Sequence, residues 1–260
     1  MIRSLSYSAT RTFLECAYRF QLHYLERRPV AVSPPLFLGA TVHLTLSTFY
    51  QRRMQGNPMS LVQCESFFSD AFQRQTILEQ EPAAQGVSWE SQDPNILEAE
   101  TLSLLKLYLD WAEKTGLRPA AIELDLRRTV DGLPISGRID IVDRSGIIID
   151  WKTTQQPGDQ EKRERDLQPL FYAALLGHPI EFHYHYLPKG RIHEIRWDSR
   201  KVSRAAMRWL TEAFLPPVWE AMQHGPFPYA DPSSWVCSPA CCDYWGICNG
   251  GALRPVCVLG

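Results

Sequence analysis

The spacing of apolar residues changes near residue 118, and this change separates helical from strand-like sequence. Up to that point apolar residues recur at helical spacing among polar ones, which predicts amphipathic helices. Beyond it, short β-branched runs bounded by turn residues predict strands. We expect helices at about residues 6–28, 38–55, 60–78, 94–114, 162–176 and 199–222, and strands at about 120–130, 135–142, 147–149, 180–187 and 191–197. This order favours an α/β fold with a central mixed β-sheet flanked by helices.

Length and composition fit one globular domain. The 260 residues can bury a sizeable core, and 45% hydrophobic with 22% charged residues is typical of a soluble protein. We divide the chain into a mainly helical part (1–118), a β-sheet core (119–198), and a carboxyl-terminal helix with a cysteine-rich segment (199–260). No apolar run approaches the roughly 20 residues of a membrane span, and the amino terminus lacks a signal-peptide pattern. A cytoplasmic location without a membrane partner is therefore expected.

Residues 135–152 carry the most information about function. They predict two strands joined by a turn at residues 143–146. In the first strand, Ile139 and Ile141 are expected on one face, so that Asp140 between them points to the other. The second strand opens with three isoleucines and no polar alternation, which indicates burial on both faces. The hairpin thus places charged residues beside an apolar core.

The hairpin is expected to bring two carboxylates and a lysine close together. Asp150 and Lys152 come directly after the isoleucine run and, two residues apart, lie on the same face. A buried carboxylate is unfavourable unless compensated, and Asp140 nearby would repel it. Mg²⁺ or Mn²⁺ held by Asp140 and Asp150 would compensate both and suits phosphodiester hydrolysis, with Lys152 stabilising charge on the phosphate. The alternative is a salt bridge at the sheet end, with Asp140 facing solvent.

The hairpin has Gly137-x-x-Asp140, then nine intervening residues, then Asp150-x-Lys152. This pattern resembles the signature of the PD-(D/E)XK nucleases. It is most similar to the RecB-like branch, which includes CRISPR-adaptation nucleases and the nuclease domains of bacterial recombination helicases. Gly39-x-x-x-His43 resembles that branch's upstream motif, whose histidine is a metal ligand. Gln168-x-x-x-Tyr172 resembles its Q-x-x-x-Y motif, in which both side chains share one helix face beside the metal.

The resemblance implies a restriction-endonuclease-like core and a Mg²⁺- or Mn²⁺-dependent deoxyribonuclease. The implied metal ligands are His43, Asp140 and Asp150, and the other implied active-site residues are Lys152, Gln168 and Tyr172. Glu123 fits a recurrent acid of the family, to which we assign a supporting or structural role. Single-stranded DNA or DNA ends are the expected substrate, exonuclease action the expected mode, and a helicase or CRISPR-adaptation integrase a conceivable protein partner. The alternative is a non-catalytic DNA-binding or assembly module of the same fold.

Seven cysteines point to a second metal centre. Four of them, Cys237, Cys241, Cys242 and Cys248, lie within twelve residues, which favours a metal site over a secreted disulfide framework. Thiolates bind zinc or an iron–sulfur cluster, and the segment lacks the paired C-x₂-C knuckles of common zinc sites. The resemblance implies that a [4Fe–4S] cluster is held by Cys16, Cys237, Cys242 and Cys248 and ties the carboxyl-terminal segment to the first helix. Cys241 in place of Cys242, and zinc in place of iron, remain open.

The net charge of −2 means that DNA affinity must come from local patches. Arg200, Arg204 and Arg208, with Lys201 alongside, have helical spacing in the predicted helix 199–222 and could follow a phosphate backbone. An ordinary solvated helix face is the alternative.

Overall fold

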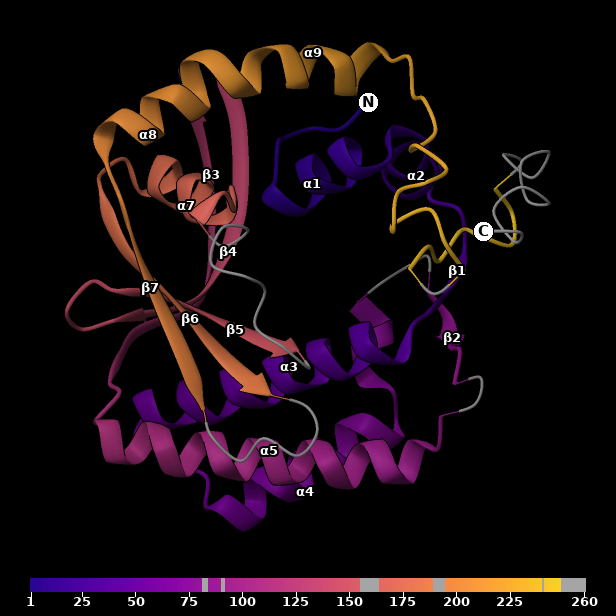
Figure 1. Cartoon of the computed structure of the whole chain (residues 1–260). Helices are drawn as coiled ribbons and strands as arrows, with labels where there is room; N and C mark the ends of the chain where they lie inside the picture. Colours follow the sequence, from indigo (N-terminus) through magenta and orange to yellow (C-terminus); the bar gives the residue numbers. More distant parts are fainter. Residues whose placement is uncertain (81–83, 90–91, 155–163, 189–194, 240, 249–260) are drawn as a thin grey trace.

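The computed structural model describes residues 1–80, 84–89, 92–154, 164–188, 195–239 and 241–248 (Figure 1). A five-stranded sheet forms its centre. The strands, in their order across the sheet, are β3 (Pro119–Val130), β4 (Leu133–Asp143), β5 (Ile148–Thr154), β6 (Ile180–Pro188) and β7 (Arg196–Val202). β5 and β6 pair in parallel and the other neighbours pair antiparallel. The predicted α/β class with a mixed sheet is therefore confirmed.

Helices cover both faces of this sheet (Figure 1). One face packs against α3 (Pro34–Met54), α4 (Leu61–Gln73) and α5 (Pro94–Thr115). The other packs against α1 (Tyr7–Glu15), α2 (Ala17–Phe20), α7 (Gln168–Leu176), α8 (Arg204–Arg208) and α9 (Leu215–His224). Shorter elements are the π-helical turns Gln21–Leu25 and Trp209–Phe214, the 3₁₀ turn Thr76–Gln80, and the parallel pair of β1 (Val30–Val32) and β2 (Ala84–Val87). Each helical layer buries its own apolar cluster against the sheet.

Several local signals act as the sequence predicts. Ser6 caps α1, and Gly116, in the left-handed conformation at φ 72°, ends α5. Ile148 and Ile149 pack into opposite apolar clusters, so the isoleucine run is buried on both faces. The helix expected at 199–222 is interrupted by a π-helical segment directly before α9, whose first turn holds Pro216 and Pro217.

Several boundaries differ from the prediction. The helix predicted from residue 162 begins at Gln168, and the strand predicted at 191–197 is β7. Residues 162–163 and 191–194 of these predictions lie outside the described residues.

Two further differences concern candidate residues. The first helix is interrupted at Cys16, whose backbone is extended and whose sulfur accepts a hydrogen bond from the Arg19 N–H. Residues 199–202 belong to strand β7, and the following helix begins after Ser203, which caps it. Arg200 therefore lies on a strand and not on a helix with Arg204 and Arg208, so the predicted basic helical stripe is wrong. Edge-strand β7 misled the prediction because its charged residues have no alternating apolar partners.

The face alternation of the hairpin also differs from the prediction. Ile139 packs in the cluster beside α7, but Ile141 packs in the opposite cluster beside α3 and α5. In β3, Leu124 and Ile122 show the same exchange. The switch occurs where Glu123 has a positive φ of 49°. In both strands, the apolar residues before and after this position therefore face opposite sides of the sheet. The sheet is consequently distorted at the position where the candidate chemistry lies.

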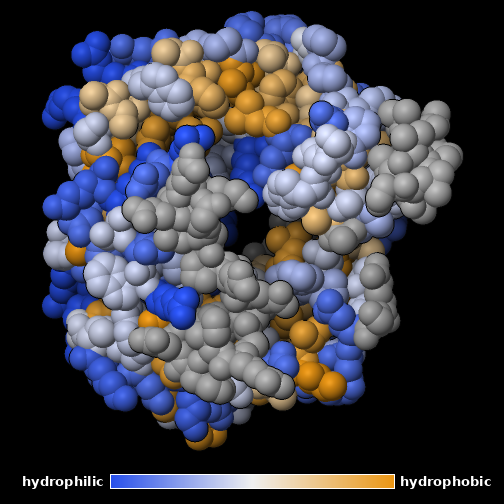
Figure 2. Space-filling model, in the orientation of Figure 1, coloured by the Kyte–Doolittle hydropathy of each residue, from blue (hydrophilic) through white to orange (hydrophobic). Residues whose placement is uncertain are grey.

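Figure 2 shows a hollow in the face presented, between α1 and α3. No helix of the described residues is long and apolar enough to cross a membrane.

Candidate active site

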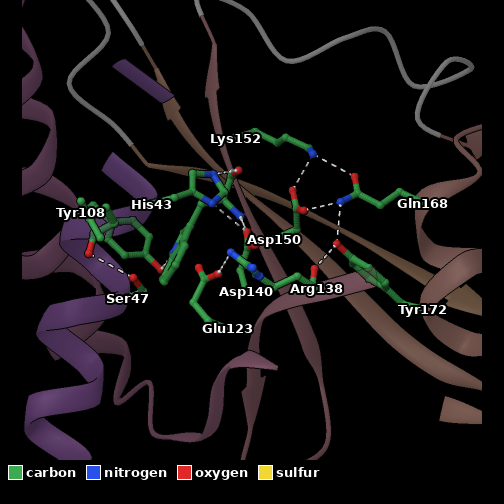
Figure 3. A network of polar contacts seen from close by, with 12 residues as sticks. His43, Ser47, Tyr108, Glu123, Arg138, Asp140, Asp150, Lys152, Gln168 and Tyr172 are labelled. Carbon is green, nitrogen blue, oxygen red and sulfur yellow. Dashed lines mark hydrogen bonds and ion pairs between the residues drawn. The ribbon is translucent and has the colours of Figure 1, made fainter. Parts of the chain in front are cut away.

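The candidate site forms where β4 separates from β5. The pairing of the two strands runs through Ile141–Ile149 and Val142–Ile148 only. Beyond that point, the Trp151 N–H donates at 3.0 Å to Oδ2 of Asp140 instead of to a strand carbonyl. Asp140 and Asp150 are both buried. The separation lets side chains from helices on both faces of the sheet reach the two carboxylates (Figure 3).

His43 reaches the site from α3. Its Nδ1 lies 3.3 Å from Oδ2 of Asp140, and its Nε2 lies 2.9 Å from the carbonyl oxygen of Trp151. Burial opposes the imidazolium form, but the Asp140 carboxylate outweighs it and raises the pKa of His43 to about 9. Both ring nitrogens therefore donate at neutral pH in the metal-free protein.

Glu123 completes a group of three ligands with His43 and Asp140. One ligand atom from each lies within 4.8 Å of the others. Burial, followed by repulsion from Asp140, raises the pKa of Glu123 to about 7. Sequence reasoning gave this acid a lesser role, although the hairpin register carried the signal. Because Ile122 pairs with Ile141 and Leu124 with Ile139, Glu123 stands opposite Asp140.

Asp150, Lys152 and Gln168 form the other half of the site. Lys152 Nζ lies 2.7 Å from Asp150 Oδ2 and donates at 2.8 Å to Oε1 of Gln168. The Gln168 amide nitrogen donates to Asp150 Oδ1 and, at 3.1 Å, to the hydroxyl of Tyr172. Tyr172 in turn donates at 2.7 Å to the carbonyl of Arg138 in β4. The predicted pair Gln168 and Tyr172 thus lies on one helix face, as expected, and connects α7 to both strands of the site.

The two aspartates are electrostatically different. Burial would raise the pKa of Asp140, but His43 and the Trp151 N–H outweigh it, and the pKa falls below its usual value. Burial raises the pKa of Asp150 to about 6 despite the opposing charge of Lys152. Asp150 Oδ2 is buried and accepts no aligned hydrogen bond, with only the Lys152 ammonium beside it. An oxygen in this state favours an added cation.

These residues fit a divalent metal ion. The oxygens of Glu123 and Asp140 and a ring nitrogen of His43 form a compact donor set, and the under-satisfied oxygen of Asp150 belongs to the same site. Oxygen-rich sets of this kind suit Mg²⁺ and Mn²⁺. The sequence predicts His43, Asp140 and Asp150 as metal ligands. The three residues whose ligand atoms lie within 4.8 Å of one another are His43, Asp140 and Glu123.

The predicted cysteine ligands lie where the carboxyl-terminal segment meets the first helices. Burial raises the pKa of the Cys242 thiol, and the charges of Cys16 and Cys248 raise it further, so the three sulfurs are close enough to interact. Asp243 accepts a 3.0 Å ion pair from Arg19 of α2, which holds the same segments together. None of the six described cysteines is in a disulfide bond; Cys257 lies outside the described residues. Figure 1 shows this segment alongside α2.

Comparison with known proteins defines the class. The sequence profile of the PD-(D/E)XK nuclease superfamily matches residues 4–249, and the chain belongs to this superfamily. Membership supports a nuclease, a hydrolase of phosphodiester bonds. None of the curated protein sequences compared with the chain is a significant match.

Two solved structures resemble the chain. A protein of Eubacterium rectale described as a "putative exonuclease" has a TM-score of 0.55 and 10% identity over 90% of this chain and 86% of its own. SSO0001 is 16% identical over 93% of each chain, but its TM-score of 0.38 carries no argument. The first likeness shows that the fold is shared.

Proposed function

We propose that the protein is a Mg²⁺- or Mn²⁺-dependent deoxyribonuclease that acts as an exonuclease on single strands or DNA ends. The observation that carries this proposal is the convergence of two buried aspartates and a lysine, from the separating strands β4 and β5, with His43 and Gln168 from opposite helical layers. A purely structural ion pair would need neither helix.

The metal ion would be held by His43, Glu123 and Asp140, with the under-satisfied oxygen of Asp150. When bound, it would supply positive charge at the scissile phosphate and acidify nearby water. Oxygen ligands from two strands and a nitrogen from α3 would fix its position relative to Lys152.

Lys152 has a defined task in this site. Burial opposes its charge, but Asp150 outweighs burial and raises the pKa of Lys152 above its usual value. The ammonium group therefore stays charged at neutral pH and cannot serve as a general base. Its side chain is 36% exposed and anchored by Asp150 and Gln168, so it can orient a water molecule and neutralise charge developing on the phosphate.

Two features support ends or single strands as the substrate. The face presented in Figure 2 is hollowed between α1 and α3, and a flexible strand enters a hollow more readily than continuous duplex does. The exonuclease description of the Eubacterium rectale protein points in the same direction. Because the sequence resembles the RecB-like branch, we also propose a helicase or a CRISPR-adaptation integrase as the protein partner.

We infer further that Cys16, Cys237, Cys242 and Cys248 hold a structural [4Fe–4S] cluster. The effect of Cys16 and Cys248 on the pKa of Cys242 supports it, as does the interruption of the first helix at Cys16. A zinc ion on the same thiolates is the competing candidate, and metal analysis after anaerobic purification separates the two.

The proposed function is tested by cleavage of end-labelled single- and double-stranded DNA with Mg²⁺ or Mn²⁺. Lys152→Ala should reduce the rate by about 100- to 1,000-fold, the usual effect of removing one group that stabilises transition-state charge. Lys106→Ala, on the exposed side of α5, is the matched control and should cleave normally. Undiminished cleavage by Lys152→Ala would contradict the mechanism. DNA binding without cleavage in the wild type would favour the non-catalytic module.

A further inference from the structure

Trp151, the residue between Asp150 and Lys152, couples two of the candidate metal ligands through its backbone. Its N–H donates to Asp140 at 3.0 Å, and its carbonyl accepts from His43 at 2.9 Å. A shift or rotation of this one residue would therefore move a carboxylate and an imidazole together. The contacts that hold Trp151 in place therefore also hold the Asp140 carboxylate and the His43 imidazole in place.

The indole ring of Trp151 is fixed by a buried hydrogen-bonded chain on the opposite side of the sheet. Its Nε1–H donates at 2.7 Å to the hydroxyl of Tyr108 on α5. That hydroxyl lies 3.1 Å from Nδ1 of His185 on β6. A tyrosine hydroxyl keeps its own proton while it accepts from Trp151, so that proton can be donated to Nδ1 of His185. The imidazole can accept because burial keeps it neutral, with its pKa lowered to about 3.

Aromatic packing prevents the indole from rotating out of this arrangement. The Tyr50 ring lies nearly parallel to it, with centroids 6.1 Å apart. The His43 ring meets it edge-on, with centroids 5.6 Å apart. Trp151, Tyr108 and Tyr50 are all fully buried, and close packing of this kind restricts the indole to one rotamer.

We propose that Tyr108 and His185 are positioning residues for the candidate metal centre and act through Trp151. They touch neither the substrate nor the candidate ligands Asp140 and Asp150. Their hydrogen-bonded chain holds the indole, the indole holds its own backbone, and the backbone orients Asp140 and His43. This inference rests on the proposed function, because it takes those two residues to be metal ligands.

Mn²⁺ affinity of the metal-free protein, measured by titration calorimetry or electron paramagnetic resonance, is the first test. Tyr108→Phe should weaken binding by about 10- to 100-fold, the usual effect of removing groups that orient metal ligands. Its DNA cleavage should fall at limiting Mn²⁺ and recover at high Mn²⁺. Thr101→Val removes another buried hydroxyl of α5, which donates to the Leu97 carbonyl of the same helix, and should leave Mn²⁺ affinity unchanged.

A double-mutant cycle with Trp151→Phe tests whether Tyr108 acts through the indole. In the Trp151→Phe background, Tyr108→Phe should cause no further loss of Mn²⁺ affinity, because the bond it breaks is already absent. An equal loss in both backgrounds would overturn the proposal. Should Tyr108→Phe fail to fold, His185→Leu probes the same chain from its far end and should weaken Mn²⁺ binding as well.

The outcomes separate this inference from the proposed function. Wild-type protein that cleaves DNA with Mn²⁺, together with a Tyr108→Phe variant of unchanged Mn²⁺ affinity, would overturn the positioning role alone. Wild-type protein that neither binds Mn²⁺ nor cleaves DNA would overturn the proposed function, and the positioning role with it.

Discussion

His185 is a buried, neutral imidazole whose protonation should couple stability to pH. Burial, reinforced by the charge of His183, lowers its folded-state pKa to about 3, against an ordinary value of about 6.5 in the unfolded chain. Between these values the unfolded state binds one proton more than the folded state. The free energy of unfolding should therefore fall as the pH drops below about 6.5, by at most about 1.4 kcal/mol per pH unit from this residue.

Chemical denaturation at pH 7, 6 and 5 checks this prediction. The decline should be shallower in His185→Leu than in the wild type, because the variant lacks the titrating group. His178→Gln, at an exposed position after α7, should retain the wild-type decline. If the free energy of unfolding declined equally with pH in His185→Leu and the wild type, the lowered pKa of His185 would be refuted.

Which active-site residues can be predicted from sequence depends on how far apart they lie along the chain. Asp150 and Lys152 are set by strand periodicity, and Gln168 and Tyr172 by one helical turn, so their mutual placement follows from local geometry. Glu123 follows from hairpin register. The chain from Trp151 to Tyr108 and His185 could not be predicted, because it depends on how α5 crosses the sheet, and no short-range pattern specifies that crossing.

At the scale of elements, the close approach of α3 to β5 positions His43. A Cβ atom on Gly39 would lie only 2.9 Å from Thr153 Oγ1, closer than side-chain atoms normally come. Gly39→Ala should push the helix and strand apart by a few tenths of an ångström and weaken the contact of His43 with Asp140. We expect roughly tenfold weaker Mn²⁺ binding, comparable to other losses of ligand orientation.

A second substitution shows whether this effect is steric. In Gly39→Ala/Thr153→Ala the interfering hydroxyl is gone, so Mn²⁺ affinity and cleavage should return toward the values of Thr153→Ala alone. Failure of the double variant to recover would mean that Gly39 serves another purpose.

Elements were predictable where local signals and tertiary packing agree. The Asp131-Gly132 turn, the Gly116 helix end and the isoleucine run of β5 fall where their chemistry places them. The phase switch around Asp140 could not be predicted, because ordinary alternation predicts one face for Ile139 and Ile141. It occurs where Glu123 has a positive φ of 49°, close to the point where β4 separates from β5. Strand β7 was predicted to end at residue 197 and not at Val202, because the residues after Trp197 carry no apolar alternation.

At the scale of the whole molecule, the two ends of the described chain pack together and enclose the sheet. The Leu5 backbone hydrogen-bonds with Pro134 and Ser136 of β4. The Tyr18 N–H donates to the Pro228 carbonyl, and Tyr244 hydrogen-bonds to the Arg28 carbonyl. The carboxyl-terminal segment thus holds the first helices, and these in turn hold β4.

The proposed [4Fe–4S] cluster would make this enclosure dependent on cysteine. The described residues between 225 and 248 form no helix or strand, so few backbone hydrogen bonds beyond local ones hold the segment in place. Cys248→Ala should lose most of the bound iron, lower the melting temperature, and make residues 225–248 sensitive to limited proteolysis. Cys64→Ala, which removes a buried thiol of α4, should keep its iron.

Comparing the iron content of Cys241→Ala with that of Cys242→Ala identifies which of the two thiols is the ligand. A Cys248→Ala protein with full stability and nuclease activity would show that the cysteines do not hold the fold closed.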